Sequence, residues 1–142
     1  NQKSPPDSRA GNIKNQKLVD VTREALALGI AQAREGNHVG DISHAVQMHV
    51  EAAGYGIVRD LVGHGVGKKL HEEPAVPNFG QPGEGPLLKI GMVIAIEPMV
   101  TAGDWQVKRA RDGWTYKTRD GSLSAHFEHT VAITKDVPMI LT

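Results

Sequence analysis

Hydrophobic side chains recur at helical spacing in two segments near the start of the chain, residues 15–34 and 41–53. Gly36 follows the first segment and Gly54 follows the second, which is where a glycine commonly ends a helix. Asp41 is a suitable N-cap for the second helix. The apolar stripes comprise Leu18, Val21, Ala25 and Leu28 in the first segment, and Ile42, Ala45, Val46, His49 and Ala53 in the second. The pattern therefore predicts two amphipathic helices that need another layer to cover them.

After Gly54 the pattern changes to short apolar runs separated by glycine and proline. Strands are predicted at 57–62, 92–96 and 124–134, a hairpin at 105–118 with Asp112-Gly113 in its turn, and loops over 72–91. The run 92–96 is apolar on both faces, which is typical of a central, covered strand. We therefore expect an α+β fold with two helices against an antiparallel or mixed sheet. Residues 1–14 are polar and lack periodicity, so they are predicted to be a loop or a disordered lead-in.

Composition bounds the class of protein. A length of 142 residues suits one domain with its own core. Sixteen basic side chains balance sixteen acidic ones, so no overall positive field favours nucleic acid as a partner. No apolar run approaches the roughly 20 residues that span a bilayer, and no signal-peptide pattern opens the chain. We expect neither a membrane nor a direct nucleic-acid partner.

The chain contains no cysteine. Disulfide bonds and thiolate metal sites are therefore excluded, which fits a cytoplasmic protein. A metal would have to be held by imidazole, carboxylate and water, and these ligands suit divalent ions such as Zn, Mn, Co or Fe.

Two carboxylates follow apolar runs. Glu97 ends the run 92–96, and Glu128 lies beside Phe127 in the last predicted strand. A buried, unpaired carboxylate costs several kcal/mol, so each acid is either at an exposed strand end or paired with a cation or with hydrogen-bond donors. Strand alternation would place His126 on the same face as Glu128.

Two histidines frame a glycine-rich segment. His64 lies between two glycines that permit close backbone approach, and His71 follows seven residues later. A lone loop histidine is usually just solvated, but the two strand-borne acids favour convergence of His64, Glu97 and Glu128 on metal. His71 would then face a substrate beside it. Of the remaining histidines, His49 on the apolar stripe is predicted to be a core histidine, and His129 a satisfied core histidine or one that supports the ligands.

Other catalytic patterns are weaker. The glycine-rich segment lacks the Gly-Lys-Ser/Thr ending of a phosphate-binding loop. The chain also has no Gly-x-Ser-x-Gly elbow and no cysteine nucleophile.

Five motifs in order resemble the C-terminal half of a type I methionine aminopeptidase, a member of peptidase family M24. They are Gly-His-Gly-Val-Gly (63–67), His-Glu-Glu-Pro (71–74), Ile-Glu-Pro-Met (96–99), Asp-Gly-Trp-Thr-Tyr-Lys-Thr (112–118) and Phe-Glu-His-Thr (127–130). The likeness covers about residues 15–142. It implies the pita-bread (creatinase/aminopeptidase) fold, and a hydrolase that removes the N-terminal methionine from nascent polypeptides by attack of a metal-bound hydroxide.

The resemblance also implies roles for individual residues. His64 and Glu97 would bind one divalent ion, and Glu128 would bridge two ions, of Co, Mn, Fe or Zn. His71 would be catalytic, hydrogen-bonding the scissile peptide. Trp114 would line the methionine pocket with Leu70, where the family often has a larger aromatic residue.

The family's site also uses two aspartates and a histidine from an upstream half, and none is recognisable here. Because the chain begins with Asn1 and matches half a site, we expect a fragment whose partner is the missing N-terminal half. Alone it would be weak or inactive. Two alternatives stay open: a prolidase-like or creatinase-like relative, and a non-catalytic pita-bread module that binds peptides or proteins.

Overall fold

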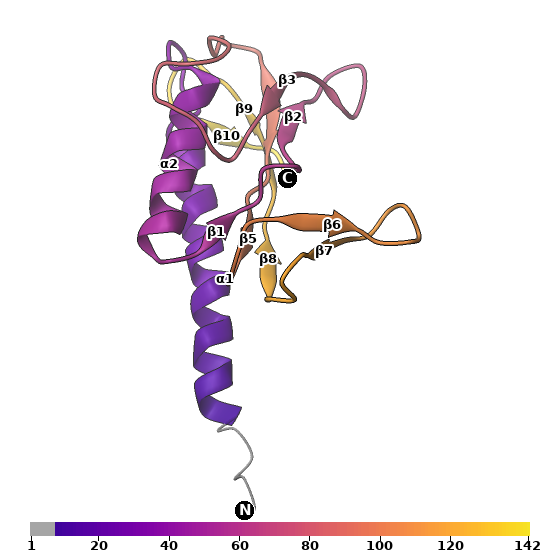
Figure 1. The fold of residues 1–142 in the computed structure, drawn as a ribbon. Coiled ribbons are helices and arrows are strands. Elements are labelled where there is room, and N and C mark those ends of the chain that lie inside the picture. Colours follow the sequence, from indigo (N-terminus) through magenta and orange to yellow (C-terminus); the bar gives the residue numbers. More distant parts are fainter. Residues whose placement is uncertain (1–7) are drawn as a thin grey trace, which may run out of the picture.

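Two helices pack side by side on one face of the strands (Figure 1). The computed structural model describes residues 8–142, in which α1 spans Ser8–Ala31 and α2 spans Val39–Ala52. The predicted loop over residues 1–14 is wrong for 8–14, which form the first turns of α1; residues 1–7 lie outside the described part. α1 is long because no proline or glycine pair interrupts it after Ser8, and the isolated glycines Gly11 and Gly29 do not end it.

The start of α2 is defined by a side chain inside the helix. Asp41 was predicted to be the N-cap, but it is the third residue of the helix. Its Oδ2 accepts a hydrogen bond from the backbone N–H of His38 at 2.7 Å. His38 takes the N-cap position in extended conformation. The acid therefore satisfies one of the free backbone donors at this helix end, in the manner of a capping box.

The helix pair is also joined by a polar contact. His49 Nε2 lies 2.8 Å from Glu24 Oε2. The predicted core position of His49 is wrong, because the histidine is partly exposed and faces α1 across the helix interface. Leu28 was likewise placed on the covered stripe of α1 but is 44% exposed, whereas Leu26 is buried.

The strands are short, and their bounds are β1 Gly56–Ile57, β2 Gly63–Gly65, β3 Glu72–Val76, β4 Val93–Ile96, β5 Met99–Thr101, β6 Val107–Arg109, β7 Tyr116–Thr118, β8 Ser124–His126, β9 His129–Ala132 and β10 Met139–Ile140. They form a five-stranded sheet in the order β10-β9-β4-β2-β3, a three-stranded sheet β1-β5-β8 and the two-stranded hairpin β6-β7. Every pairing is antiparallel. The predicted α+β class is therefore confirmed.

Several strand predictions need correction. Residues 63–65 of the glycine-rich segment, which lie outside the predicted strands, form β2, and the predicted loops over 72–91 contain β3. The predicted strand 57–62 is reduced to β1, and β5 was not foreseen. β3 was not predicted because the many prolines and glycines in residues 72–91 are typical of turns. The strand nevertheless pairs with β2, through Gly63↔Val76 and His64↔Ala75.

Two chain segments pass from one sheet to the other. β4 in the five-stranded sheet leads through Glu97 and Pro98 into β5 of the three-stranded sheet. The predicted single strand 124–134 is in fact β8 and β9, which make the opposite passage at Phe127 and Glu128. The two breaks are adjacent, since the backbone N–H of Phe127 donates to the carbonyl of Pro98 at 3.4 Å.

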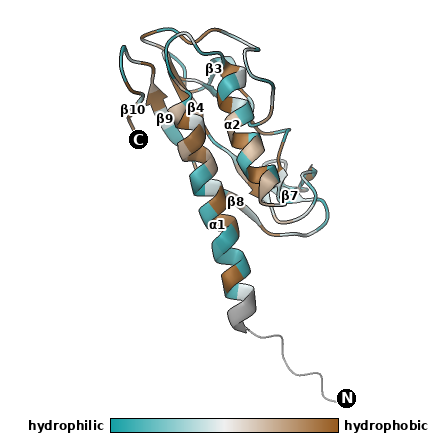
Figure 2. Ribbon diagram, turned by 90° about the vertical axis from the view of Figure 1, so that its left-hand side faces the viewer, coloured by the Kyte–Doolittle hydropathy of each residue, from teal (hydrophilic) through white to brown (hydrophobic). Residues whose placement is uncertain are grey.

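The core lies between the helices and the two sheets. Figure 2 shows the helices in front of the strands, with hydrophobic residues recurring along both. Burying each large aliphatic side chain contributes about 1.5–3 kcal/mol. One buried cluster supports the five-stranded sheet: Leu26, Ala33, Val39, Ile42, Val76, Leu88, Ile94, Ile96, Val131 and Ile133. A second lies at the three-stranded sheet: Leu18, Ala25, Val46, Val50, Ile57 and Val100.

The predicted hairpin is confirmed as an arm, β6-β7, that projects from the body (Figure 1). Its turn contains Gly113 at a φ of 79°, a backbone conformation that favours glycine. Within residues 8–142, no helix combines the length and apolar character needed to cross a membrane.

Candidate metal centre

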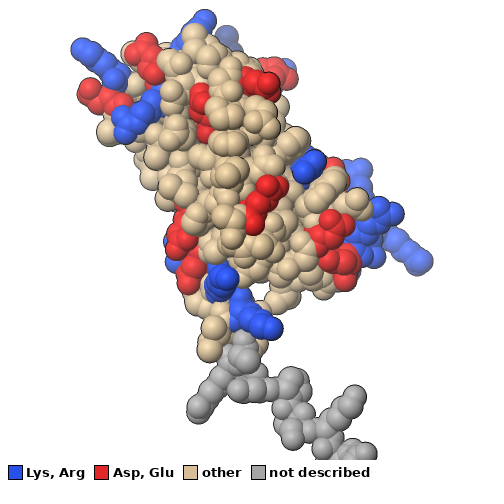
Figure 3. All heavy atoms as spheres, turned by 60° about the vertical axis from the view of Figure 1, so that its left-hand side comes forward, with Lys and Arg blue, Asp and Glu red and all other residues tan. Residues whose placement is uncertain are grey.

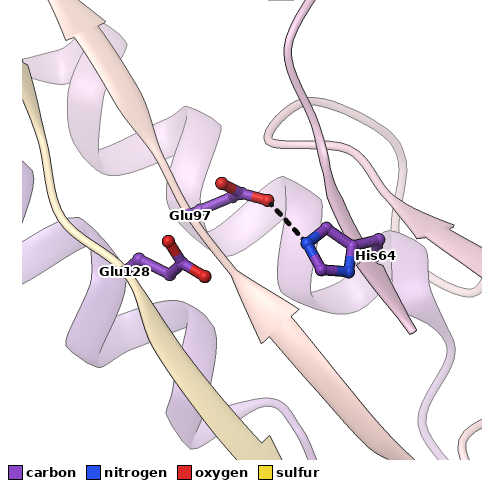
Figure 4. Close-up of side chains that lie close together, drawn as sticks. All are labelled: His64, Glu97 and Glu128. Carbon is purple, nitrogen blue, oxygen red and sulfur yellow. Dashed lines mark ion pairs between the residues drawn. The ribbon is translucent and has the colours of Figure 1, made fainter. Parts of the chain in front are cut away.

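The three predicted ligand residues converge. One ligand atom each from His64, Glu97 and Glu128 lies within 4.8 Å of the others. Figure 4 shows the three side chains pointing toward one another from separate strand segments. His64 belongs to β2, Glu97 follows β4, and Glu128 lies between β8 and β9. Because β2 and β9 are the two neighbours of β4, the sheet order itself brings the three residues together.

The glycines beside His64 permit the close strand packing that places it. A Cβ atom on Gly63 would meet the backbone carbonyl oxygen of Ala95, and one on Gly65 would meet that of Glu73. Both flanking strands therefore approach β2 more closely than a side chain allows. The register of β2 with β3 also shifts between His64 and Gly65. The glycine-rich motif thus serves the sheet packing around His64.

The imidazole of His64 is oriented by the backbone of the next residue. Nδ1 lies 2.9 Å from the carbonyl oxygen of Gly65. A carbonyl can only accept, so Nδ1 carries the hydrogen, and in the neutral ring Nε2 presents its lone pair. Nε2 faces Glu97, with Oε1 at 3.4 Å. Fixing the second nitrogen in this way is how proteins commonly orient a metal-binding histidine.

Glu97 sits where the β4 ladder ends. Its side chain is only 19% exposed, and the following Pro98 has no N–H to continue the ladder. The backbone carbonyl of Glu97 instead accepts a hydrogen bond from Asn78 Nδ2 at 3.2 Å. The carboxylate is thereby held at the edge of the break, largely out of solvent.

Glu128 occupies the matching break. Phe127 packs against the buried cluster of the five-stranded sheet, and Glu128 lies on the side of His64 and Glu97. Unlike Glu97, Glu128 is exposed. Two carboxylates this close repel each other unless a cation or proton compensates them.

His126 is a further member of this neighbourhood. Its Nε2 lies 3.6 Å from Glu97 Oε2. The Glu97 carboxylate, and to a smaller extent Glu128, raise the pKa of His126 against the opposing effect of burial. Strand alternation placed His126 near Glu128, but gave no contact with Glu97, because that contact depends on the pairing of β8 with β5.

His71 lies beside His64. The ring centroids are 4.1 Å apart and the ring planes are tilted by 48°. The two histidines open on a surface hollow of about 770 Å³, lined by Val62, Gly63, His64, Lys69, His71, Glu72, Glu73 and Ala75. A neutral or charged imidazole at this place can donate a hydrogen bond to a molecule bound in the hollow.

Leu70 and Trp114, the other two predicted substrate-contact residues, are exposed. Leu70 is 72% exposed, and Trp114, in the segment joining β6 to β7, is 85% exposed. Neither lines the hollow beside His64. Their solvent exposure shows that neither side chain is needed to fill the core of the described chain.

His129, predicted to be a satisfied core or supporting histidine, is satisfied but only partly buried. Its Nδ1 lies 2.6 Å from the backbone carbonyl oxygen of Thr142, and the side chain lines an apolar groove between α1 and β10. His44 Nδ1 similarly lies 3.2 Å from the carbonyl oxygen of Gly80. Both histidines are satisfied by backbone groups outside the three-residue cluster.

The donor set fits a divalent ion. The imidazole supplies a nitrogen ligand and the two carboxylates supply oxygen ligands. The negative charge of the carboxylates is opposite to that of the ion. The orientation of His64 by Gly65 and the low exposure of Glu97 reduce the reorganisation that binding would require. The residues present are therefore suited to hold Zn, Mn, Fe or Co.

Comparisons with known proteins agree with this geometry. Residues 5–135 match the model of metallopeptidase family M24. The chain is 54% identical over 134 residues to a methionine aminopeptidase of Clostridium perfringens, covering 93% of this chain and 54% of that protein. The crystal structure of methionine aminopeptidase from Thermotoga maritima superposes with a TM-score of 0.89 at 52% identity, covering 91% of this chain and 52% of that one.

A prolidase structure from Pyrococcus horikoshii is more distant, with a TM-score of 0.69 at 25% identity, covering 92% of this chain and 32% of that one. The chain spans about half the length of the curated relatives it matches. The predicted pita-bread fold is confirmed by these structural matches. The family match, which extends over most of the sequence, shows that the chain belongs to metallopeptidase family M24.

Proposed function

We propose that residues 15–142 of this chain are the C-terminal half of a methionine aminopeptidase. That enzyme would remove the N-terminal methionine from newly made polypeptides in the cytoplasm. The observation that carries the proposal is the convergence of His64, Glu97 and Glu128 within 4.8 Å. The similarity to methionine aminopeptidases supports the substrate class, since identity is 52% to the Thermotoga enzyme and 25% to the Pyrococcus prolidase.

His64 Nε2 and a carboxylate oxygen of Glu97 would hold one divalent ion, and Glu128 would bridge to a second. A bound ion of this class polarises a carbonyl and makes water a nucleophile near neutral pH. The chain's contribution is to fix these ligands: Gly65 orients the His64 ring, and Asn78 holds the backbone of Glu97. Co, Mn, Fe and Zn all accept such ligands.

His71 would act on the substrate. Its ring packs against His64 at the hollow, so it can donate a hydrogen bond to the scissile peptide carbonyl as negative charge develops there. Leu70 and Trp114 would line the methionine pocket. Their exposure in the described chain supports a role at a surface that another segment completes.

The missing half would complete both the site and the core. An apolar groove runs between α1 and the edge strand β10, lined by Leu26, Ala27, Ile30, Ala31, Phe127 and Ile140 together with Arg23 and His129. Figure 3 shows a face on which residues other than Lys, Arg, Asp and Glu predominate, with several acidic side chains among them. The remaining half of the protein would pack here and supply further ligands. The chain alone would therefore be weakly active or inactive.

Calorimetric titration with Co(II) tests the proposed centre. We expect the chain to bind Co(II) and the His64→Ala variant to lose that binding, while thermal unfolding changes little. The matched control is His49→Ala, which removes a histidine that pairs with Glu24 on the helices. Equal binding by the original chain and His64→Ala would contradict the proposal.

Activity distinguishes the alternatives. The chain combined with the missing half should release methionine from a methionyl peptide faster than it cleaves an X-Pro dipeptide. The reverse preference would favour the prolidase-like alternative. Peptide binding without cleavage, at saturating Co(II), would favour a non-catalytic binding module.

A further inference from the structure

We propose that His126 is a positioning residue that fixes the orientation of the Glu97 carboxylate, so that one oxygen of Glu97 is directed toward His64 and a bound ion. The inference rests on the metal centre proposed above. It concerns a residue that does not belong to the group of three converging ligands.

The two oxygens of Glu97 face different imidazoles. Oε1 lies 3.4 Å from His64 Nε2, and Oε2 lies 3.6 Å from His126 Nε2. At 3.6 Å this contact is an ion pair rather than a hydrogen bond, and an N–H on His126 Nε2 attracts Oε2 and so favours the orientation that keeps Oε1 beside His64 Nε2. Outer partners of this kind fix the ligand and tune its basicity.

The backbone places His126 for this role. His126 pairs with Met99 across β8 and β5, and Met99 follows Glu97 by two residues. The hydrogen bond from the Phe127 N–H to the Pro98 carbonyl joins the same two segments. His126 and Glu97 are therefore attached to one antiparallel pair, whose register sets the separation of their side chains.

A purely structural role for His126 accounts less well for these observations. The His126 side chain is 41% exposed, so it does not fill the core, whereas the Glu97 side chain is 19% exposed. The Nε2 atom of its ring lies 3.6 Å from Glu97 Oε2, and the other oxygen of that carboxylate, Oε1, lies 3.4 Å from His64 Nε2. The contact thus extends the metal centre from the five-stranded sheet into the three-stranded sheet.

Substitutions that separate the N–H donor from the ring test the inference. His126→Leu removes the donor, and His126→Gln keeps an N–H donor without the imidazole. We would measure the Co(II) dissociation constant and the visible absorption spectrum of bound Co(II) for both variants of the 142-residue chain. Loss of an outer partner typically weakens metal binding by about 10–100-fold.

We expect His126→Leu to weaken Co(II) binding by at least about 10-fold and to alter the spectrum, with His126→Gln restoring both toward the original values. Thermal unfolding of the metal-free variants should be similar. Unchanged affinity and spectrum in His126→Leu, or equal loss in both variants, would overturn the positioning role alone. Absence of Co(II) binding by the unsubstituted chain, both alone and combined with the missing half, would overturn the proposed metal centre as well.

Discussion

Asn78 Nδ2 donates a hydrogen bond to the backbone carbonyl of Glu97 at 3.2 Å, at the point where β4 ends. The same amide group lies 3.5 Å from the carbonyl oxygen of Leu61. Asn78 is buried, so it connects the segment before β2 with the segment after β4 from inside the protein. The side-chain amide of Asn78 thereby holds the backbone of Glu97, a proposed metal ligand.

Asn78→Ala should lower the free energy of unfolding by about 1–3 kcal/mol, because buried carbonyl groups lose their donor. It should also weaken Co(II) binding, since the backbone of Glu97 loses a support. Chemical denaturation and calorimetry measure the two effects. An unchanged denaturation midpoint together with unchanged Co(II) affinity would show that the contact has no such role.

Gly63→Ala should destabilise the fold by about 1–3 kcal/mol, as overpacking usually does. The added Cβ would meet the backbone carbonyl of Ala95, which cannot move without displacing β4. Gly11→Ala is the matched control, because a Cβ there meets nothing within 4 Å and the residue lies in α1. It should stabilise the protein by up to about 1 kcal/mol. Equal effects of the two substitutions in thermal unfolding would contradict this account.

Asp112 should make the hairpin arm sensitive to acid. The Thr115 hydroxyl, then the backbone N–H groups of Thr115 and Trp114, hold the pKa of Asp112 below its ordinary value of 3.8. Because the folded-state pKa is depressed, the stabilising contribution is complete above pH 3.8 and is lost as the pH falls through the lower folded value. NMR titration of the carboxyl group should show this midpoint.

Thr115→Val removes the hydroxyl donor to Asp112. The midpoint of Asp112 should then rise toward its ordinary value, and the Trp114 indole resonances should follow the same titration. A midpoint that does not move would show that the hydroxyl group is not the main cause.

Trp114→Ala should change the free energy of unfolding by no more than about 0.5 kcal/mol, as is usual for surface substitutions. The side chain is 85% exposed, so its loss leaves no cavity. If Trp114 lines the methionine pocket, the complete enzyme should show a KM about tenfold higher, equivalent to about 1.4 kcal/mol of lost apolar contact. A large loss of stability with unchanged KM would instead assign Trp114 a structural role.

The sequence by itself determined the two helices, the central strand β4, the hairpin arm and three of the residues in the site. These features follow from local rules: apolar spacing in α1 and α2, an apolar run before Glu97, and Asp112-Gly113 in a turn. A carboxylate such as Glu97 after an apolar run is also locally recognisable, because burial of an unpaired charge is costly.

Only the tertiary structure decided how these pieces meet. Glu97 and Glu128 lie together because two chain segments change sheets at adjacent points, and the contact of His126 with Glu97 depends on the register of β8 with β5. The start of α1, the strand character of His64 and the pairing of β3 were likewise not predicted. Pairing between strands distant in sequence depends on contacts that no local pattern contains, so it is fixed only when the whole core packs.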